Sequence, residues 1–148
     1  MPVTPCVLLL DWRVARMPES PHHLSVRVYY EDTDMGGIVY HANYLKFIER
    51  ARSDWVRSLG LDQRALLNDT GMVFVVRRIE ADYLAPAYYD DVLDVVTTVQ
   101  SVSGVRLVMS QKVQRGEKVL FQANVTVACI ASNGSPARLP AQIRALTA

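Results

Sequence analysis

Two acids, a glycine pair and a histidine lie close together near the start of the chain. Asp32 and Asp34 follow an alternating apolar pattern, Gly36 and Gly37 come next, and His41 opens a long amphipathic pattern. A carboxylate can serve as a general base or as a nucleophile. The first N–H groups of a helix lack partners within the helix and carry partial positive charge, so they can stabilise a developing negative charge. The segment therefore indicates an active site.

The same residues have a simpler interpretation that involves no chemistry. Aspartate is common in turns and at caps, so Asp32 and Asp34 could simply shape a turn before the glycine pair. Gly36 and Gly37 are free to take positive φ, which an ordinary tight turn also uses. From residue types alone, the turn role of Asp34 is the favoured one.

A strand and a helix must position this segment. The strand is predicted over Leu24 to Glu31, where apolar and polar residues alternate. One face of this strand would carry Leu24, Val26, Val28 and Tyr30. The helix is predicted from about His41 to Leu59, before a natural stop at Gly60. Its apolar stripe would contain Tyr44, Ile48, Ala51, Trp55 and Leu59.

Four strand-like runs follow the helix, over residues 72–84, 91–101, 105–114 and 118–131. Turn residues separate the last three, which predicts an antiparallel meander. Helical turns are expected at 62–68 and 141–146. The expected fold class is α+β, an antiparallel sheet of about five strands wrapped around one long central helix. Residues 1–23 lack periodicity, so we expect an irregular leader, with Met17 as a candidate start, before a single domain over residues 24–148.

Composition limits the function classes. The chain has 148 residues, enough for one domain, and its formal net charge of +1 gives no general attraction to nucleic acid or anionic membranes. Cys6 and Cys129 are too few for a disulfide framework, and Cys129 in an apolar run is expected to be a buried thiol. A reducing, cytoplasmic setting fits this usage. The sequence predicts no transmembrane segment, no secretion signal and no metal site.

Two charged side chains fall in or beside the apolar stripe of the long helix. Arg52 lies inside the stripe and Glu49 lies at its edge. Because isolated charges are rarely buried without a partner, we expect them to pair with each other or with strand residues, unless the helix faces a subunit interface there. Glu49 is expected to be structural, paired with Arg52 or Arg50.

Several runs of the chain together resemble a known enzyme family. The runs are Tyr30 to Asp34, Gly36 to His41, Tyr44-Leu45, Phe47 to Arg52, Phe74 to Arg77, Tyr83 to Ala87 and Asp90-Asp91. They are similar to runs in the hotdog-fold acyl-CoA thioesterases, and more narrowly to the 4-hydroxybenzoyl-CoA thioesterase family and its YbgC-type enzymes, which are encoded with the Tol-Pal envelope system. The resemblance covers Val26 to Ala131.

The resemblance implies an antiparallel sheet of five or six strands around a long helix. It also implies two subunits joined into one continuous sheet, further assembly into a homotetramer, and active sites at the subunit interface. The substrate would be an acyl-CoA thioester, so coenzyme A is part of the substrate and no separate cofactor is needed. An acyl carrier protein is a further candidate partner.

The resemblance assigns roles residue by residue. The family's catalytic aspartate is the second acid of its D-x-D motif, which is Asp34 here, acting as general base on water or as nucleophile through an acyl-aspartyl anhydride. The backbone N–H that polarises the thioester carbonyl corresponds to His41, whose imidazole could add a hydrogen bond. Gly36 and Gly37 would let the acyl group approach closely.

Two tyrosines in the matched runs are candidates for the acyl pocket. Tyr30 and Tyr40 could line it, although aromatic residues beside a strand and a turn are more often core residues. Basic residues that would bind the CoA phosphates cannot be assigned. Candidates by charge alone are Arg77, Arg78, Arg106 and Lys112.

The implied function is hydrolysis of short-chain aliphatic or aromatic acyl-CoA to free acid and CoA. Two alternatives stay open. Hotdog folds also include hydroxyacyl-thioester dehydratases, which use a histidine and an acid from the partner subunit, and His41 with Glu49 could imitate that pair. The other alternative is a non-catalytic module that binds acyl carrier protein or an envelope-system partner. No G-x-S-x-G motif supports a serine-triad hydrolase.

Overall fold

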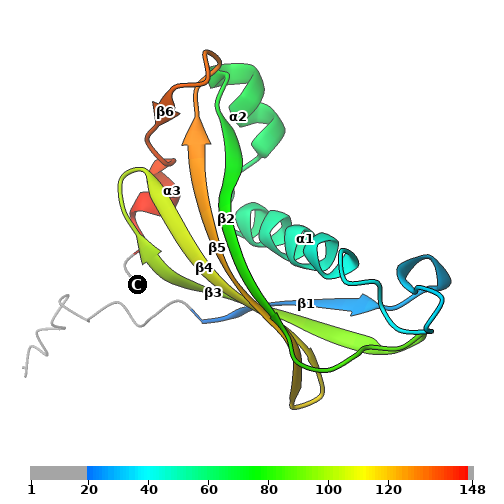
Figure 1. Ribbon diagram of the computed structural model, residues 1–148. Coiled ribbons are helices and arrows are strands. Elements are labelled where there is room, and N and C mark those ends of the chain that lie inside the picture. The colour runs from blue at the N-terminus through cyan, green and yellow to red at the C-terminus, as the bar shows by residue number, and fades with distance from the viewer. Residues whose placement is uncertain (1–19, 147–148) are drawn as a thin grey trace, which may run out of the picture.

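One long helix lies against the concave face of a curved antiparallel sheet (Figure 1). The computed structural model describes residues 20–146. In chain order the helices and strands are β1 (His22–Arg27), the 3-10 turn η1 (Tyr30–Asp32), α1 (Asn43–Ser58), α2 (Gln63–Thr70), β2 (Val73–Tyr83), β3 (Val92–Val102), β4 (Arg106–Arg115), β5 (Lys118–Ile130), β6 (Pro136–Ala137) and α3 (Ala141–Arg144).

The sheet has the order β1-β3-β4-β5-β2, and the two-residue β6 pairs with β5. Every pairing is antiparallel, and β3, β4 and β5 form the predicted meander. The prediction of an α+β fold with about five strands around one helix is therefore confirmed. Each of the four strands expected after the helix was placed to within two residues at either end.

The central helix α1 is held by its apolar stripe. Tyr44, Ile48, Ala51 and Trp55 are buried as predicted, and Phe47 joins them with no exposed surface. Leu59, the last residue of the predicted stripe, lies just after the helix and is only partly buried. The helix packs on β1, β3 and β4. Fully burying a side chain such as Phe47 contributes about 1.5–3 kcal/mol, so this stripe fixes the helix against the sheet. Its first turn, which begins at Asn43 rather than His41, is placed by the same packing.

The first strand differs from the prediction. It ends at Arg27, and Tyr30 lies in η1 with 78% of its surface exposed instead of on the strand face that carries Val26. The cause is local, because a carboxylate oxygen of Asp32 accepts a hydrogen bond from the backbone N–H of Tyr29 at 2.8 Å and turns the chain. The strand also begins at His22, inside the expected leader; Met17 and Cys6 lie outside the described residues.

The strand β2 forms one edge of the sheet and has no fully buried residue. It is one of the longer strands, and it exposes the apolar side chains of Val76, Ile79 and Tyr83. A long apolar edge is a template for pairing with another chain, since its backbone N–H and C=O groups lack partners on that side.

No helix in the described part of the chain is long and apolar enough to cross a membrane.

Cys129 on β5 is a buried thiol, as predicted, with 1% of its surface exposed. Burial raises its pKa to about 11. The reactive thiolate is therefore scarce at pH 8, and we expect Cys129 to resist iodoacetamide in the folded protein and to react after denaturation. Mass spectrometry of peptides labelled before and after denaturation measures this. Equal labelling in both states would contradict the buried position.

Candidate active site

Asp34 lies in a tight turn between η1 and α1. Its N–H donates to the carbonyl of Ile38, its own carbonyl accepts from the N–H of Gly37, and its carboxylate Oδ1 accepts from the N–H of Gly36 at 2.8 Å. The other carboxylate oxygen, Oδ2, has no hydrogen-bond partner within residues 20–146. The turn role expected for Asp34 thus occupies only one of its two oxygens, and the second remains available for chemistry.

The two glycines are each required by this turn. Gly37 has φ of 77°, a left-handed conformation that other residues adopt at a cost. A Cβ added at Gly36 would lie 3.2 Å from Asp34 Oδ1, tighter than ordinary van der Waals contact. Gly36 therefore permits the close approach of backbone and carboxylate, and Gly37 closes the turn. Neither glycine lines the groove described next.

An open groove of about 450 Å³ brings Asp34 and His41 together. The backbone N–H of His41 donates to no group in the described part of the chain, and α1 begins without a capping side chain. His41 lies two residues before the first residue of α1, and a free backbone N–H beside a helix N-terminus is suited to bind a carbonyl oxygen. The remaining groove residues are mainly apolar: Ile38, Val39, Tyr44, Tyr83, Leu84, Ala85 and Pro86.

Two tyrosines hold the start of α1 against the end of β2. Tyr83 donates its hydroxyl hydrogen to the carbonyl of His41 at 2.9 Å, and the hydroxyl of Tyr44 accepts from the N–H of Ala87 at 3.2 Å. The ring of Tyr44 stacks on Phe121, with 5.0 Å between centroids, and burial raises the pKa of Tyr44. Tyr83 was not among the predicted site residues, because its contact with His41 joins residues that lie far apart in the sequence.

Asp32 performs the structural role that was one of its two interpretations. It is buried, its carboxylate accepts from Tyr29, and its carbonyl accepts from the N–H of Tyr40 and the side-chain amide of Asn43. These bonds tie η1 to the first turn of α1. Asp32 does not line the groove, so Asp34 is the acid that the fold presents there.

The two tyrosines considered for the acyl pocket lie outside the groove. Tyr30 stacks on Tyr89 at 4.4 Å between centroids, on the protein surface. Tyr40 is also exposed, and its ring contacts the ring of His41 at 4.5 Å. The ring of His41 also meets the edge of the Tyr83 ring, so its imidazole lies among aromatic side chains.

The predicted ion pair between Glu49 and Arg52 is wrong, and Arg50 does not replace it. Glu49 accepts a hydrogen bond from the hydroxyl of Ser53 at 2.7 Å, four residues along the helix. Arg52 donates to the side-chain oxygen of Gln111 on β4 at 2.9 Å, so the alternative of a strand partner holds for Arg52.

Within residues 20–146, no group of three or more His, Cys, Asp or Glu side chains is placed to hold a metal ion.

Residues 36–122 match the model of the thioesterase superfamily. The chain belongs to that superfamily. It is 43% identical over 130 residues to the acyl-CoA thioesterase YbgC of Haemophilus influenzae, a match that covers 87% of this chain and 96% of the relative. It is 45% identical over 106 residues to the acyl-CoA thioester hydrolase YbgC of Escherichia coli O157:H7, which covers 71% of this chain and 78% of the relative.

Solved structures give the same result. A probable thioesterase from Bartonella henselae superposes with a TM-score of 0.79 at 39% identity, over 82% of this chain and all of the other. The 1,4-dihydroxy-2-naphthoyl-CoA thioesterase of Synechocystis superposes with a TM-score of 0.77 at 26% identity, over 82% of this chain and 91% of the other. The resemblance to hotdog thioesterases is therefore confirmed, and the protein is an enzyme of the thioester hydrolase class.

Proposed function

We propose that this protein hydrolyses acyl-CoA thioesters in the groove at Asp34. The observation that carries the proposal is that Asp34 and His41 line the same groove, while Asp34 Oδ2 and the backbone N–H of His41, just before α1, have no hydrogen-bond partner within residues 20–146. Hydrolysis of a thioester needs these two groups, one to activate water or attack the carbonyl carbon and one to stabilise the oxyanion. The names of the YbgC relatives support coenzyme A as the thiol.

The chemistry follows from these two positions. Asp34 takes a proton from water as the water attacks the carbonyl carbon, or Asp34 attacks that carbon itself and the anhydride is then hydrolysed. In both routes the His41 N–H donates to the carbonyl oxygen as negative charge develops on it. One such donor typically contributes about 2.7–4 kcal/mol to lowering the barrier. Collapse of the tetrahedral intermediate releases the CoA thiolate.

The substrates that we propose are short-chain aliphatic or aromatic acyl groups, with coenzyme A as the leaving thiol and no other cofactor. A cytoplasmic location is part of the proposal, because the chain has few cysteines and Cys129 is kept as a buried free thiol. An acyl carrier protein as partner, a role beside the Tol-Pal system and a homotetramer remain predictions from the resemblance.

Pairing of two copies through β2 is also part of the proposal. The support is its long free edge with exposed Val76 and Ile79. We expect light scattering of the purified protein to give at least the mass of two chains, and Val76→Lys to shift the population toward one chain. The exposed Val105, outside the regular strands, provides the control Val105→Lys. A wild-type protein that is monomeric at micromolar concentration would contradict this pairing.

A panel of acyl-CoA substrates tests the proposed function. It should include acetyl, butyryl, hexanoyl, benzoyl and 3-hydroxybutyryl thioesters, with free thiol and enoyl product both measured. We expect thiol release from at least one of the short or aromatic substrates. Enoyl product from the hydroxyacyl substrate without thiol would instead show a dehydratase, and the absence of both products across the panel would favour a binding module.

A further inference from the structure

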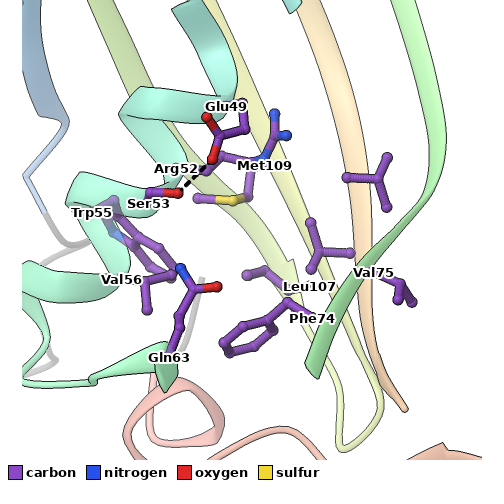
Figure 2. Close-up of a pocket in the computed structure, with 12 residues that line it drawn as sticks. Glu49, Arg52, Ser53, Trp55, Val56, Gln63, Phe74, Val75, Leu107 and Met109 are labelled. Carbon is purple, nitrogen blue, oxygen red and sulfur yellow. Dashed lines mark hydrogen bonds between the residues drawn. The ribbon is translucent and has the colours of Figure 1, made fainter. Parts of the chain in front are cut away.

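A second, smaller pocket lies between α1 and the strands β2 and β4 (Figure 2). Its volume is about 160 Å³, and no residue lines both this pocket and the groove at Asp34. A dry apolar cavity of about 150 Å³ is large enough to hold benzene, so one ring or a short branched chain fits here. The apolar walls include Trp55, Val56, Phe74, Leu107, Met109 and Val127.

The pocket also contains a cation that is not neutralised by an ion pair. Arg52 lines it, is only partly exposed to solvent, and has no carboxylate within ion-pair distance in the described part of the chain. Its guanidinium carries five N–H donors, and the only side-chain hydrogen bond it makes there uses one nitrogen. Burial lowers the pKa of Arg52, and the negative charge of Glu49 offsets part of that effect.

The fold holds this cation in place with a fully buried amide. The side-chain oxygen of Gln111 accepts from Arg52, while its amide nitrogen donates to the carbonyl of Ile48 at 2.9 Å and to the hydroxyl of Thr97 at 3.0 Å. Gln111 has no exposed surface, and its strand neighbours on the same face, Leu107 and Met109, are apolar. Burying an amide there has a desolvation cost, which its three hydrogen bonds offset, and one of these bonds fixes the position of Arg52.

We propose that this pocket binds a small carboxylate with an apolar body, and that Arg52 recognises the carboxylate. A planar guanidinium with unused donors matches a carboxylate in geometry and charge. The pocket walls and volume match a ring or a short chain. Carboxylates are also the products of thioester hydrolysis, so such ligands accompany the reaction of this superfamily.

Glu49 is a negatively charged group in the same pocket, and its effect on affinity differs between a carboxylate ligand and a neutral one. Glu49 lines the same pocket, and Figure 2 shows its carboxylate bonded to Ser53 on the helix side. Its charge repels a bound carboxylate, so Glu49→Gln should tighten binding. A neutral hydroxyl ligand would behave differently, because it would donate to Glu49 and accept from Arg52, and either substitution would weaken it.

Nuclear magnetic resonance on the full chain tests the proposal without turnover. The probes are benzoate and its neutral isostere benzamide, and the signals are the indole N–H of Trp55 and the methyl group of Met109, two residues that line the pocket. We expect benzoate to bind more tightly than benzamide. Arg52→Gln should weaken benzoate by about tenfold or more, because a hydrogen bond between charged groups is lost, and should weaken the neutral benzamide by much less. Glu49→Gln should tighten benzoate by a few fold.

Two further variants control for folding and for general charge. Arg52→Lys keeps the charge without the planar fork, so it should weaken benzoate less than Arg52→Gln. Arg57→Gln removes an exposed charge five residues further along α1, outside the pocket, and should change nothing. The proposal is overturned if benzoate and benzamide bind equally, if neither moves the two signals, or if Glu49→Gln and Arg52→Gln weaken benzoate alike.

Enzyme kinetics then distinguish two sources of the bound carboxylate. It is either a free acid, or the far end of an acyl group whose thioester is bound in the Asp34 groove of another subunit. Glutaryl-CoA carries a distal carboxylate, and valeryl-CoA has the same chain length without one. A KM raised by Arg52→Gln for glutaryl-CoA alone identifies the acyl group, and unchanged values for both identify a free acid. If neither thioester is hydrolysed, the proposed hydrolysis of these substrates fails while the binding result stands by itself.

Discussion

Replacing Asp34 by asparagine is expected to lower kcat/KM for the best acyl-CoA substrate by about 10²–10⁴-fold. The amide cannot take a proton from water and is a poor nucleophile, so both routes to the tetrahedral intermediate are blocked. Its oxygen can still accept from the N–H of Gly36, as Oδ1 does at 2.8 Å, which preserves the turn. Thiol release from the substrate panel gives the rate, and thermal denaturation of the same samples shows that the fold is retained.

The control is a neighbouring acid with the same change of charge. Glu31 is exposed in η1 and does not line the groove, so Glu31→Gln should keep wild-type kinetics. Unchanged thiol release by Asp34→Asn would remove this carboxylate from the mechanism. Equal losses in both variants would mean that the charge of the loop, and not the position of Asp34, sets the rate.

The architecture was predictable because its signals are local and repeated. The apolar stripe of Tyr44, Ile48, Ala51, Trp55 and Leu59 predicts a helix with one buried face, and the structure buries the first four and leaves Leu59 partly buried just after the helix. The strands carry the two-residue alternation that β4 shows from Leu107 to Val113. Because one face of each helix or strand is buried, its apolar residues recur at regular intervals, and this periodicity can be recognised in a single sequence.

The errors arise where side chains bond to distant or unexpected partners. The first strand was predicted to reach Glu31, but the carboxylate of Asp32 bonds the N–H of Tyr29 and turns the chain. That bond is specific to one side chain and does not alter the apolar alternation. Likewise, the hydroxyl of Tyr83 donates to the carbonyl of His41, and the apolar pattern of a strand does not indicate the hydrogen-bond partner of a tyrosine hydroxyl.

The partner of Arg52 shows what signal was available. A charged pair with Glu49 was expected because the two lie close on one helix, but the partner is a neutral amide far along the chain. Gln111 lies on the buried face of β4, between Met109 and Val113, at a position where the alternating pattern predicts an apolar residue. A polar residue at a buried strand position must find a buried partner, so Gln111 in the sequence of β4 already indicates a buried hydrogen-bond network.

Replacing Gln111 by leucine is expected to lower the free energy of unfolding by about 3 kcal/mol. The substitution leaves the guanidinium of Arg52 and the buried hydroxyl of Thr97 without the amide that they contact, and each unsatisfied group costs about 1–3 kcal/mol. Urea denaturation measures the loss. Gln122→Leu on β5 changes the same chemical group at an exposed position and should shift stability by less than about 0.5 kcal/mol.

A double variant separates the structural from the functional role of this network. Replacing both partners of a buried hydrogen bond by apolar groups can be nearly neutral, so Arg52→Leu with Gln111→Leu should lose less stability than the two single losses added together. Additive losses would show that the two side chains stabilise the fold independently. If the apolar pair folds nearly as well but benzoate no longer binds, stability does not require the network. The buried amide of Gln111 is then explained by the position that it gives to Arg52.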